Sequence, residues 1–192
     1  MEYFRSEAIP DREERGLRRA LLDIFETVII SVVLFIAINA VSSRIRVESI
    51  SMQPTLYPGN FVLVNKLTYR FGDPRRGDII VFHYPPDPTQ VPYIKRVIGL
   101  PGEHVHIENG NVSVNGQLLT EIYLTVDTYR GGDWTVGEDQ LFVMGDNRNN
   151  SSDSRVWGMV PLANVIGKAE VIYWPPDRWR VIHFPMAAAA EP

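Results

Sequence analysis

Two closely spaced serines are the first residues that could carry chemistry. Ser49 and Ser51 are two positions apart, so their side chains point to the same side if the backbone there is extended. Pro54 stiffens the chain just beyond them. A serine hydroxyl acts as a nucleophile when a base takes its proton, so these serines would need a base from elsewhere in the chain. The alternative interpretation is a polar turn that precedes the next apolar strand.

A lysine within an apolar run is a candidate for that base. Lys95 and Arg96 follow one another in the run 93–98, which has the composition of a strand. Successive strand side chains face opposite sides, so we expect one of the two to point toward the core. Burial disfavours the charged form of a lysine and lowers its pKa, which makes it a general base near neutral pH.

A third segment, 145–155, holds eleven residues with no apolar side chain. It contains several carboxylates, hydroxyls and arginines that could surround a site. A solvated surface loop has the same composition, and composition alone leaves both interpretations open.

The positions of the histidines and the absence of cysteine limit which metal sites and catalytic groups the chain can form. His104 and His106 would share one strand face without a third ligand nearby, which favours polar residues on a solvated face over a metal site. A Ser-His-Asp triad is possible with these or with His83 or His183, but no Gly-x-Ser-x-Gly elbow is present. The absence of cysteine excludes disulfides, thiolate chemistry and cysteine-ligated zinc.

The composition is that of a globular protein, with 45% hydrophobic and 22% charged residues. The 19 basic residues are outnumbered by 23 acidic ones, and the net charge is −4. Because a protein that follows the phosphates of nucleic acid usually has the opposite balance, we expect no nucleic-acid partner.

One apolar stretch predicts a transmembrane helix. Residues 27–43 carry no charge, and the longer run 21–43 spans a bilayer core of about 30 Å as a helix. A buried core helix and a cleaved secretory signal are the alternatives. Four arginines lie closely before the run and two after it, which favours an inside N-terminus and an outside C-terminal part.

After this run the pattern is that of short strands. Two Asn-Gly pairs, at 109–110 and 115–116, lie between alternating apolar positions and predict a three-stranded meander with type I′ turns. The expected fold is therefore mainly β: an antiparallel β core with a small inserted β subdomain, preceded by one transmembrane helix. The predicted strands are Phe61–Val64, Ile79–Phe82, Tyr93–Ile98, Leu141–Met144 and Val165–Trp174.

The domain organisation follows from these patterns and from the turn residues between them. We expect a cytoplasmic segment and then the anchor, followed by a discontinuous catalytic core that contains the inserted subdomain, and last a disordered tail. We expect the inserted subdomain to shape substrate approach without supplying chemistry. The cytoplasmic segment is 1–20 and the anchor is 21–43. The catalytic core is 44–101 and 141–185, the inserted subdomain is 102–140, and the tail is 186–192.

Four segments together resemble a known family. The sequence Ser-Ile-Ser-Met-Gln-Pro-Thr-Leu at 49–56 and the segments 76–82, 93–102 and 145–158 are similar to the successive signature boxes of bacterial type I signal peptidases. They occur in the family's order and after a membrane anchor of the family's kind. The resemblance extends from the apolar run to about Trp174.

The resemblance implies a Ser-Lys serine protease. Ser51 would be the nucleophile and Lys95 the general base, with an oxyanion hole formed by the Ser51 N–H and the Ser49 hydroxyl. Ser151 would orient the lysine ammonium. Because a neighbouring carboxylate would hold the proton on Lys95, we expect apolar surroundings with only the hydroxyls of Ser51 and Ser151 in reach. Lysine at position 95, where eukaryotic endomembrane relatives have histidine, indicates the bacterial type.

The same resemblance assigns supporting residues. Asp146, Asp153 and Arg155 would brace the site through ion pairs, together with Arg96. Asn149 departs from the family, because many relatives have aspartate there. The departure removes one loop charge and touches neither nucleophile nor base.

The function implied is removal of signal peptides from translocated precursor proteins by a membrane-anchored serine endopeptidase. Small residues at P1 and P3 of the precursor, contact with membrane lipid and a place near the translocation machinery are implied as well. No metal or organic cofactor is needed. The expected location is the bacterial cytoplasmic (inner) membrane, single-pass, with the catalytic domain outside. Ser51 follows Val41 by only ten residues, so it must work within about 35 Å of the end of the span.

Two other functions fit parts of the sequence. A membrane-anchored β module could bind extended peptides by strand addition without cutting them, but it would not need a desolvated lysine beside a serine. A self-cleaving Ser-Lys protease of the repressor type would carry a DNA-binding segment, which the transmembrane run and the acidic charge do not fit. The aromatic segment 173–179 suits a bilayer interface and the edge of a β core equally.

Overall fold

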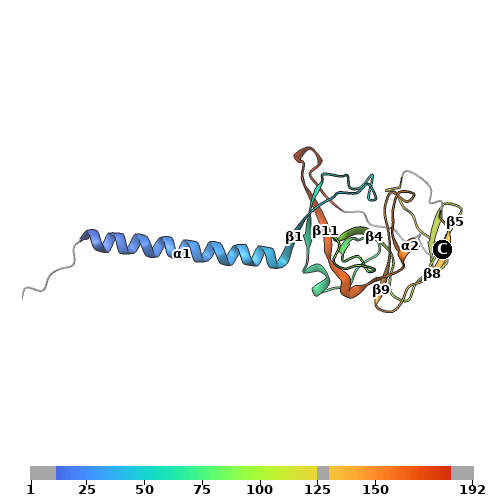
Figure 1. Ribbon diagram of the computed structural model, residues 1–192, viewed down its shortest axis with the longest axis horizontal. Coiled ribbons are helices and arrows are strands. Elements are labelled where there is room, and N and C mark those ends of the chain that lie inside the picture. The colour runs from blue at the N-terminus through green and yellow to red at the C-terminus, as the bar shows by residue number, and fades with distance from the viewer. Residues whose placement is uncertain (1–11, 125–129, 183–192) are drawn as a thin grey trace, which may run out of the picture. The chain divides into compact units, whose positions relative to one another are not determined.

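The structure is a computed structural model that describes residues 12–124 and 130–182 (Figure 1). It divides into two units, Met1–Ala40 and Val41–Pro192, which are described in turn. The tail expected at 186–192 lies outside the described residues.

The first unit contains the helix α1, Arg12–Val41. Its part Gly16–Val41 is long and apolar enough to cross a membrane, and the most apolar window of that part has no residue buried within the protein. The helix ends at Val41, so Ser42 and Ser43, which the sequence analysis placed in the span, begin strand β1 instead. The reason is pairing: the Val41 carbonyl accepts from the N–H of Lys66, and β1 then runs antiparallel to β2.

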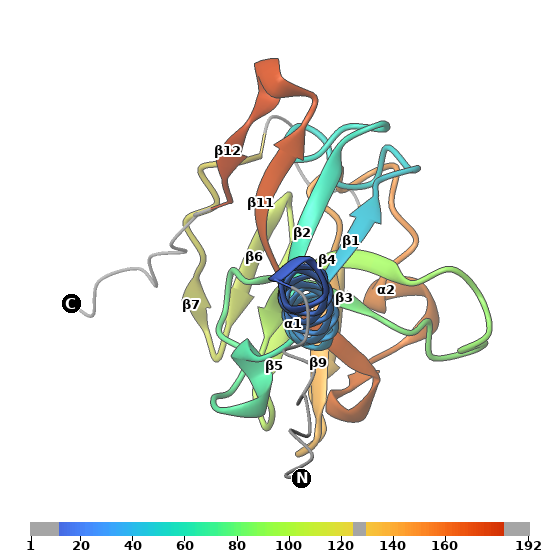
Figure 2. The same ribbon diagram turned by 90° about the vertical axis from the view of Figure 1, so that its left-hand side faces the viewer.

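The second unit is built on an eight-stranded antiparallel sheet, as the sequence predicts. Its order is β1-β2-β11-β3-β4-β9-β10, with β12 paired to β11. Figure 2 shows β11 between β2 and β12. The strands are Ser42–Arg46 (β1), Phe61–Asn65 (β2), Ile79–Phe82 (β3), Tyr93–Gly99 (β4), Gln140–Met144 (β9), Val160–Pro161 (β10), Val165–Trp174 (β11) and Arg180–Val181 (β12).

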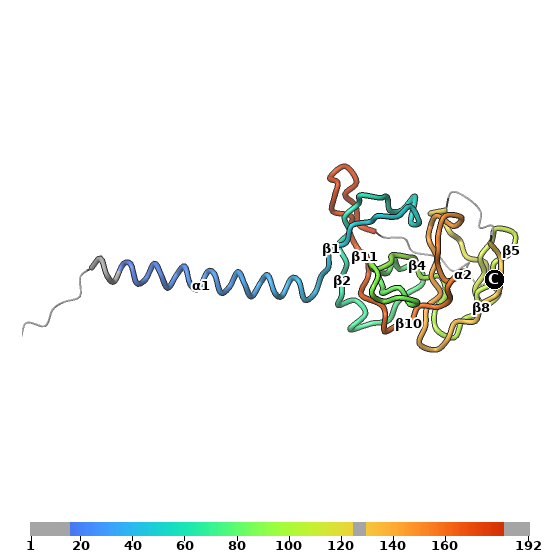
Figure 3. The backbone as a smooth tube through the Cα atoms, in the orientation of Figure 1, coloured from blue at the N-terminus to red at the C-terminus, as the bar shows by residue number. Residues whose placement is uncertain are grey.

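A smaller four-stranded sheet, in the order β7-β6-β5-β8, is inserted in the chain between β4 and β9 (Figure 3). The predicted meander is confirmed: β5, β6 and β7 pair antiparallel in sequence. Asn109 and Asn115 have φ of 51° and 52°, and the glycine after each also has positive φ, as a type I′ turn requires. The strands are His104–Glu108 (β5), Asn111–Val114 (β6), Gln117–Leu118 (β7) and Gly132–Thr135 (β8).

The five strands predicted from apolar runs are all present, with ends that differ by at most one residue. The remaining strands of the main sheet, and β8, were not predicted because they are short or polar. Among the described residues that follow Val41, helical structure is limited to single turns: η1 (Thr68–Arg70), α2 (Ser154–Trp157), η2 (Leu162–Asn164) and η3 (Pro176–Arg178).

The main sheet is buried on both faces at its centre. In β3, Ile79 and Val81 pack into one apolar cluster, while Ile80 and Phe82 pack into another on the opposite face. The adjacent strand β4 is enclosed in the same way, so Lys95 and Arg96 are both buried. Lys95 is buried, as expected of one of the two, and Arg96 is buried as well because both faces of this sheet are covered.

Candidate active site

Lys95 and Ser51 meet in the second unit although 44 residues separate them. Lys95 Nζ donates a hydrogen bond to Ser51 Oγ at 2.8 Å and another to the Ile94 carbonyl at 3.1 Å. Lys95 is 4% exposed and Ser51 5%. Burial lowers the pKa of Lys95 to about 8, against the opposing attraction of Asp153 and Asp146. At pH 7 about one lysine in ten is then the free base, which can accept a proton from the serine.

The backbone around Ser51 is held by a tight turn and by two apolar anchors. The N–H of Gln53 donates to the Ile50 carbonyl at 3.1 Å. Met52 and Leu56, which follow, are fully buried in the core. This turn sets the direction of the Ser51 side chain, which lies toward Lys95.

The residues expected to form an oxyanion hole lie together. Ser49 Oγ is 3.1 Å from Ser51 Oγ. Within the described residues, the backbone N–H of Ser51 donates to no acceptor. One N–H and one hydroxyl thus lie beside Ser51 Oγ, where they can donate to the oxygen of a carbonyl group bound next to it.

The polar segment 145–155 is a built part of the site, and the interpretation of it as a solvated loop is wrong. The N–H of Gly145 donates to Asp153 Oδ2 at 3.0 Å, and its carbonyl accepts from Arg148 Nε at 3.1 Å. A Cβ atom at position 145 would clash with Ser151 Oγ and lie 2.5 Å from the Ser51 carbonyl oxygen. Glycine is therefore required where this segment approaches the nucleophile.

Ser151 does not make the contact expected of it. Its Oγ is buried and forms no hydrogen bond of acceptable geometry within the described residues. It packs against Gly145 and lies near enough to Asp153 to help lower the pKa of that carboxyl. Lys95 finds its second acceptor in its own strand, at the Ile94 carbonyl, so the expected contact with Ser151 is replaced.

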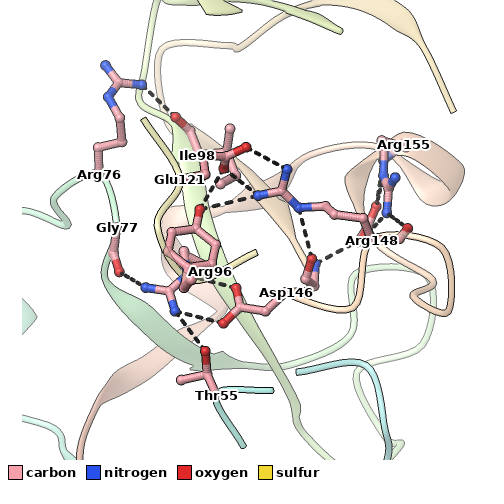
Figure 4. A network of polar contacts seen from close by, with 12 residues as sticks. Thr55, Arg76, Gly77, Arg96, Ile98, Glu121, Asp146, Arg148 and Arg155 are labelled. Atoms are coloured by element: carbon pink, nitrogen blue, oxygen red, sulfur yellow. Dashed lines mark hydrogen bonds and ion pairs between the residues drawn. The ribbon is translucent and has the colours of Figure 1, made fainter. Parts of the chain in front are cut away.

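The ion pairs implied by the resemblance are present, and Figure 4 shows the polar network to which they belong. Arg96 binds Asp146 through two hydrogen bonds of 2.8 and 2.7 Å, with both side chains almost fully buried. Arg155 binds Asp153 through two bonds of 2.8 Å. Burial alone would raise the pKa of Asp153, but Arg155, together with the Gly145 N–H and Ser151, holds that pKa below its usual range.

Sequence reasoning missed a second layer that comes from the inserted subdomain. Arg148 forms a bidentate ion pair with Glu121, with one bond of 2.8 Å from Nη1 to Oε2. Tyr123 donates to Glu121 at 2.6 Å, and its ring lies 3.9 Å from the guanidinium carbon of Arg96. Glu121 and Tyr123 gave no sequence signal, because the arginines they contact lie more than twenty residues away and one of them in another sheet.

A pocket of about 340 Å³ opens beside the Ser51–Lys95 pair. One wall is the chain from Ile45 to Ser51, which contains the end of β1, and another is the segment 91–95. Asn150 and Ser152 of the polar segment also line it. Ser51 and Lys95 therefore both line a cavity whose walls are mostly apolar.

The histidines that the structure describes lie outside this site. His106 Nδ1 is 2.8 Å from Asp133 on the exposed face of the small sheet, and this contact raises the pKa of His106. His83 follows β3 and is exposed. His183 is outside the described residues. Among the described residues, no group of three or more His, Cys, Asp or Glu side chains could hold a metal ion.

Comparisons with known proteins agree on one family. The family described as "Signal peptidase, peptidase S26" matches residues 21–174. A signal peptidase I from Leptolyngbya laminosa is 44% identical over 82% of this chain and 82% of its own length, and one from Bacillus caldolyticus is 40% identical over 85% and 93%. A solved signal peptidase I from Enterococcus faecalis V583 is 35% identical and covers 50% of this chain and 97% of its own, with a TM-score of 0.47.

The chain therefore belongs to the signal peptidase family, peptidase S26, and is a hydrolase of the type I signal peptidase class.

The buried amine predicts a stability effect that separates Lys95 from the other lysines. Because its pKa in the folded protein is about 8 and that of a solvated lysine is about 10.4, the unfolded chain binds more protons between these values, and stability rises with pH there. We expect Lys95→Met to raise the free energy of unfolding at pH 7 by up to about 3 kcal/mol, and the gain to shrink toward pH 10.

Urea unfolding of the full chain in detergent, followed by tryptophan fluorescence, measures this difference. Lys168→Met is the control, because Lys168 is ion-paired with Asp78 at 2.6 Å and its loss should not stabilise the protein. A destabilised Lys95→Met protein at pH 7 would contradict the argument.

Proposed function

We propose that this signal peptidase cleaves by a Ser-Lys dyad, with Ser51 as nucleophile and Lys95 as general base, and that α1 anchors it in the membrane. The observation that carries the proposal is the 2.8 Å hydrogen bond between Lys95 Nζ and Ser51 Oγ, with both residues buried. A lysine with a pKa of about 8 suits a general base that operates near neutral pH.

The proposed cycle has two halves. In the first, Lys95 takes the proton of Ser51 as Oγ bonds to the scissile carbonyl carbon, and the oxyanion receives hydrogen bonds from the Ser51 N–H and the Ser49 hydroxyl. The intermediate collapses, the C–N bond breaks, and the leaving amine takes the proton from Lys95. In the second half, Lys95 deprotonates water, which attacks the acyl-enzyme; the ester C–Oγ bond breaks, Lys95 returns the proton to Ser51 Oγ, and the carboxyl product leaves. No metal or organic cofactor takes part in these steps.

The proposed substrates are secretory precursors with small side chains at P1 and P3. The pocket beside Ser51 is at the small end of the usual range for ligand sites, about 300–1,000 Å³, which favours small groups. A pocket that rejects larger side chains by clash discriminates more sharply than one that selects by attraction. We also propose that the chain has a catalytic core, 44–101 and 141–185, with an inserted β subdomain, 102–140.

The proposed location is the bacterial inner membrane, with contact to lipid and a place near the translocation machinery. The support is the apolar helix α1 and the arginine excess before it, which favours an inside N-terminus. Ser51 follows the end of α1 by ten residues, so the nucleophile stays near the membrane surface, where a precursor presents its cleavage site. Confinement to one membrane also raises the effective concentration of enzyme and substrate.

Substitutions at the dyad test the mechanism directly. Ser51→Ala should abolish cleavage of a labelled precursor by the detergent-solubilised protein. Lys95→Arg should be as inactive as Lys95→Ala, because a guanidinium keeps its proton at any working pH. Ser49→Ala should keep residual activity and lose about 10²- to 10³-fold in kcat, since it removes one oxyanion donor. Near wild-type cleavage by Lys95→Arg would overturn the Ser-Lys mechanism.

The pH dependence follows from the state of Lys95. Because the free base is the active form, kcat/KM should rise about tenfold per pH unit below pH 8 and level off above it. The apparent pKa of this limb, about 8, belongs to the free enzyme. A profile that is flat from pH 6 to pH 9 would contradict Lys95 as the base.

Orientation is tested in right-side-out membrane vesicles. Added protease should digest the part of the chain that follows α1 and spare the N-terminal segment. Vesicles opened with detergent, in which both parts become accessible, are the control. Protection of the large C-terminal part in closed vesicles would reverse the proposed topology.

A further inference from the structure

Asn147 contacts both peptide carbonyls that flank Ser51. Its backbone N–H donates to the Ser51 carbonyl at 2.9 Å. Its side-chain Nδ2 donates to the Ile50 carbonyl at 3.2 Å. One residue of the polar segment thus holds the peptide on each side of the nucleophile.

The peptide between Ile50 and Ser51 carries the N–H of the proposed oxyanion hole. Because a peptide unit is planar and trans, fixing its carbonyl oxygen also fixes the direction of its N–H. The Ile50 carbonyl accepts a second bond, from the N–H of Gln53 at 3.1 Å. Hydrogen bonds to the carbonyl polarise the peptide, and this strengthens the donor at its other end.

A second asparagine decides which end of the Asn147 amide faces Ile50. Asn150 Nδ2 donates to Asn147 Oδ1 at 3.0 Å, so the oxygen end is occupied and the NH₂ end is turned to the Ile50 carbonyl. The N–H of Asn150 also donates to the Asn147 carbonyl at 3.0 Å, which closes a turn. The orientation of this amide is therefore set at both ends.

We propose that Asn147, held by Asn150, is a positioning residue that aims the Ser51 N–H at the oxyanion of the tetrahedral intermediate. The inference rests on the proposed function, because it takes Ser51 as the nucleophile. Asn147 acts through the Ile50–Ser51 peptide. Its contribution is larger in the transition state, where the oxyanion charge develops, than in the complex with uncleaved substrate.

The test uses Asn147→Asp in the full chain, with Asn149→Asp as a matched control. The first variant keeps the side-chain shape but replaces the donor by a carboxylate oxygen that repels the Ile50 carbonyl. The second places the same charge on the same segment at an exposed position. We expect Asn147→Asp to lower kcat about 10- to 100-fold with KM within about twofold, and the control to change neither by more than about twofold.

Inhibition by a peptide aldehyde is a measurement that would not change if Asn147 only stabilised the fold. Ser51 Oγ adds to the aldehyde carbon to form a hemiacetal, whose oxygen occupies the oxyanion position. The corresponding peptide alcohol binds without this bond. Asn147→Asp should weaken aldehyde inhibition by about the factor by which kcat falls, and should leave alcohol binding unchanged.

The outcomes separate the alternatives. Equal weakening of both ligands, or a raised KM with unchanged kcat, would show a substrate contact and overturn the proposal, as would wild-type kinetics in Asn147→Asp. If that variant does not fold, Asn147→Ala and Asn150→Ala take its place. The double variant should then have the same kcat as Asn147→Ala alone. Additive losses in kcat would show that Asn150 does not act through Asn147, and would overturn that part of the proposal.

Ser51→Ala, measured alongside, tests the proposed function by itself. Activity in Ser51→Ala overturns the dyad and this inference together. An inactive Ser51→Ala beside fully active Asn147 variants overturns only the positioning role.

Discussion

The constraint on which this structure depends is the burial of an amine next to a serine hydroxyl. An isolated ammonium in an apolar environment is unstable, and burial therefore lowers its pKa. Lys95 meets this condition in the middle of a sheet that is buried on both faces, where it retains two acceptors, Ser51 Oγ and the Ile94 carbonyl. An edge strand would leave the amine in water with an ordinary pKa, and the proposed base for Ser51 would stay charged near neutral pH.

The neighbouring charges are arranged so that Lys95 keeps this property. Among the buried arginines and lysines of the described chain, each arginine has a carboxylate partner within ion-pair distance and Lys95 does not. Strand alternation places Lys95 and Arg96 on opposite faces, so Asp146 pairs with Arg96 and acts on Lys95 only at longer range. Buried ion pairs of this kind contribute little net stability, and their role here is to fix geometry while they neutralise charge.

The sequence was informative wherever the signal is local. The long apolar helix α1 follows from hydropathy, the central strands from apolar runs, and the meander from two Asn-Gly turns. Strands β1 and β8 escaped prediction because polar residues become strands there only through pairing with a neighbour. The same limit hid Glu121 and Tyr123: a glutamate in a polar stretch indicates a solvated side chain until the fold brings a buried arginine to it. The expected contact of Ser151 with Lys95 is absent, because a family resemblance assigns a role to a residue but does not determine its side-chain rotamer.

The polar segment 145–155 shows why composition misleads at a catalytic site. Its lack of apolar side chains is typical of a surface loop, yet Asp153 is fully buried and Arg148 is 1% exposed. Such burial is tolerable because partners are supplied at nearly every polar group: Gly145 is held at its N–H and its carbonyl, and Arg148 at its guanidinium. Glu121, in the connection between β7 and β8, provides the carboxylate for Arg148, so the rigidity of the segment that meets Ser51 depends on a part of the chain that lies outside the main sheet. A site assembled this way can hold the nucleophile by its backbone and leave the serine hydroxyl and the lysine amine free to exchange a proton.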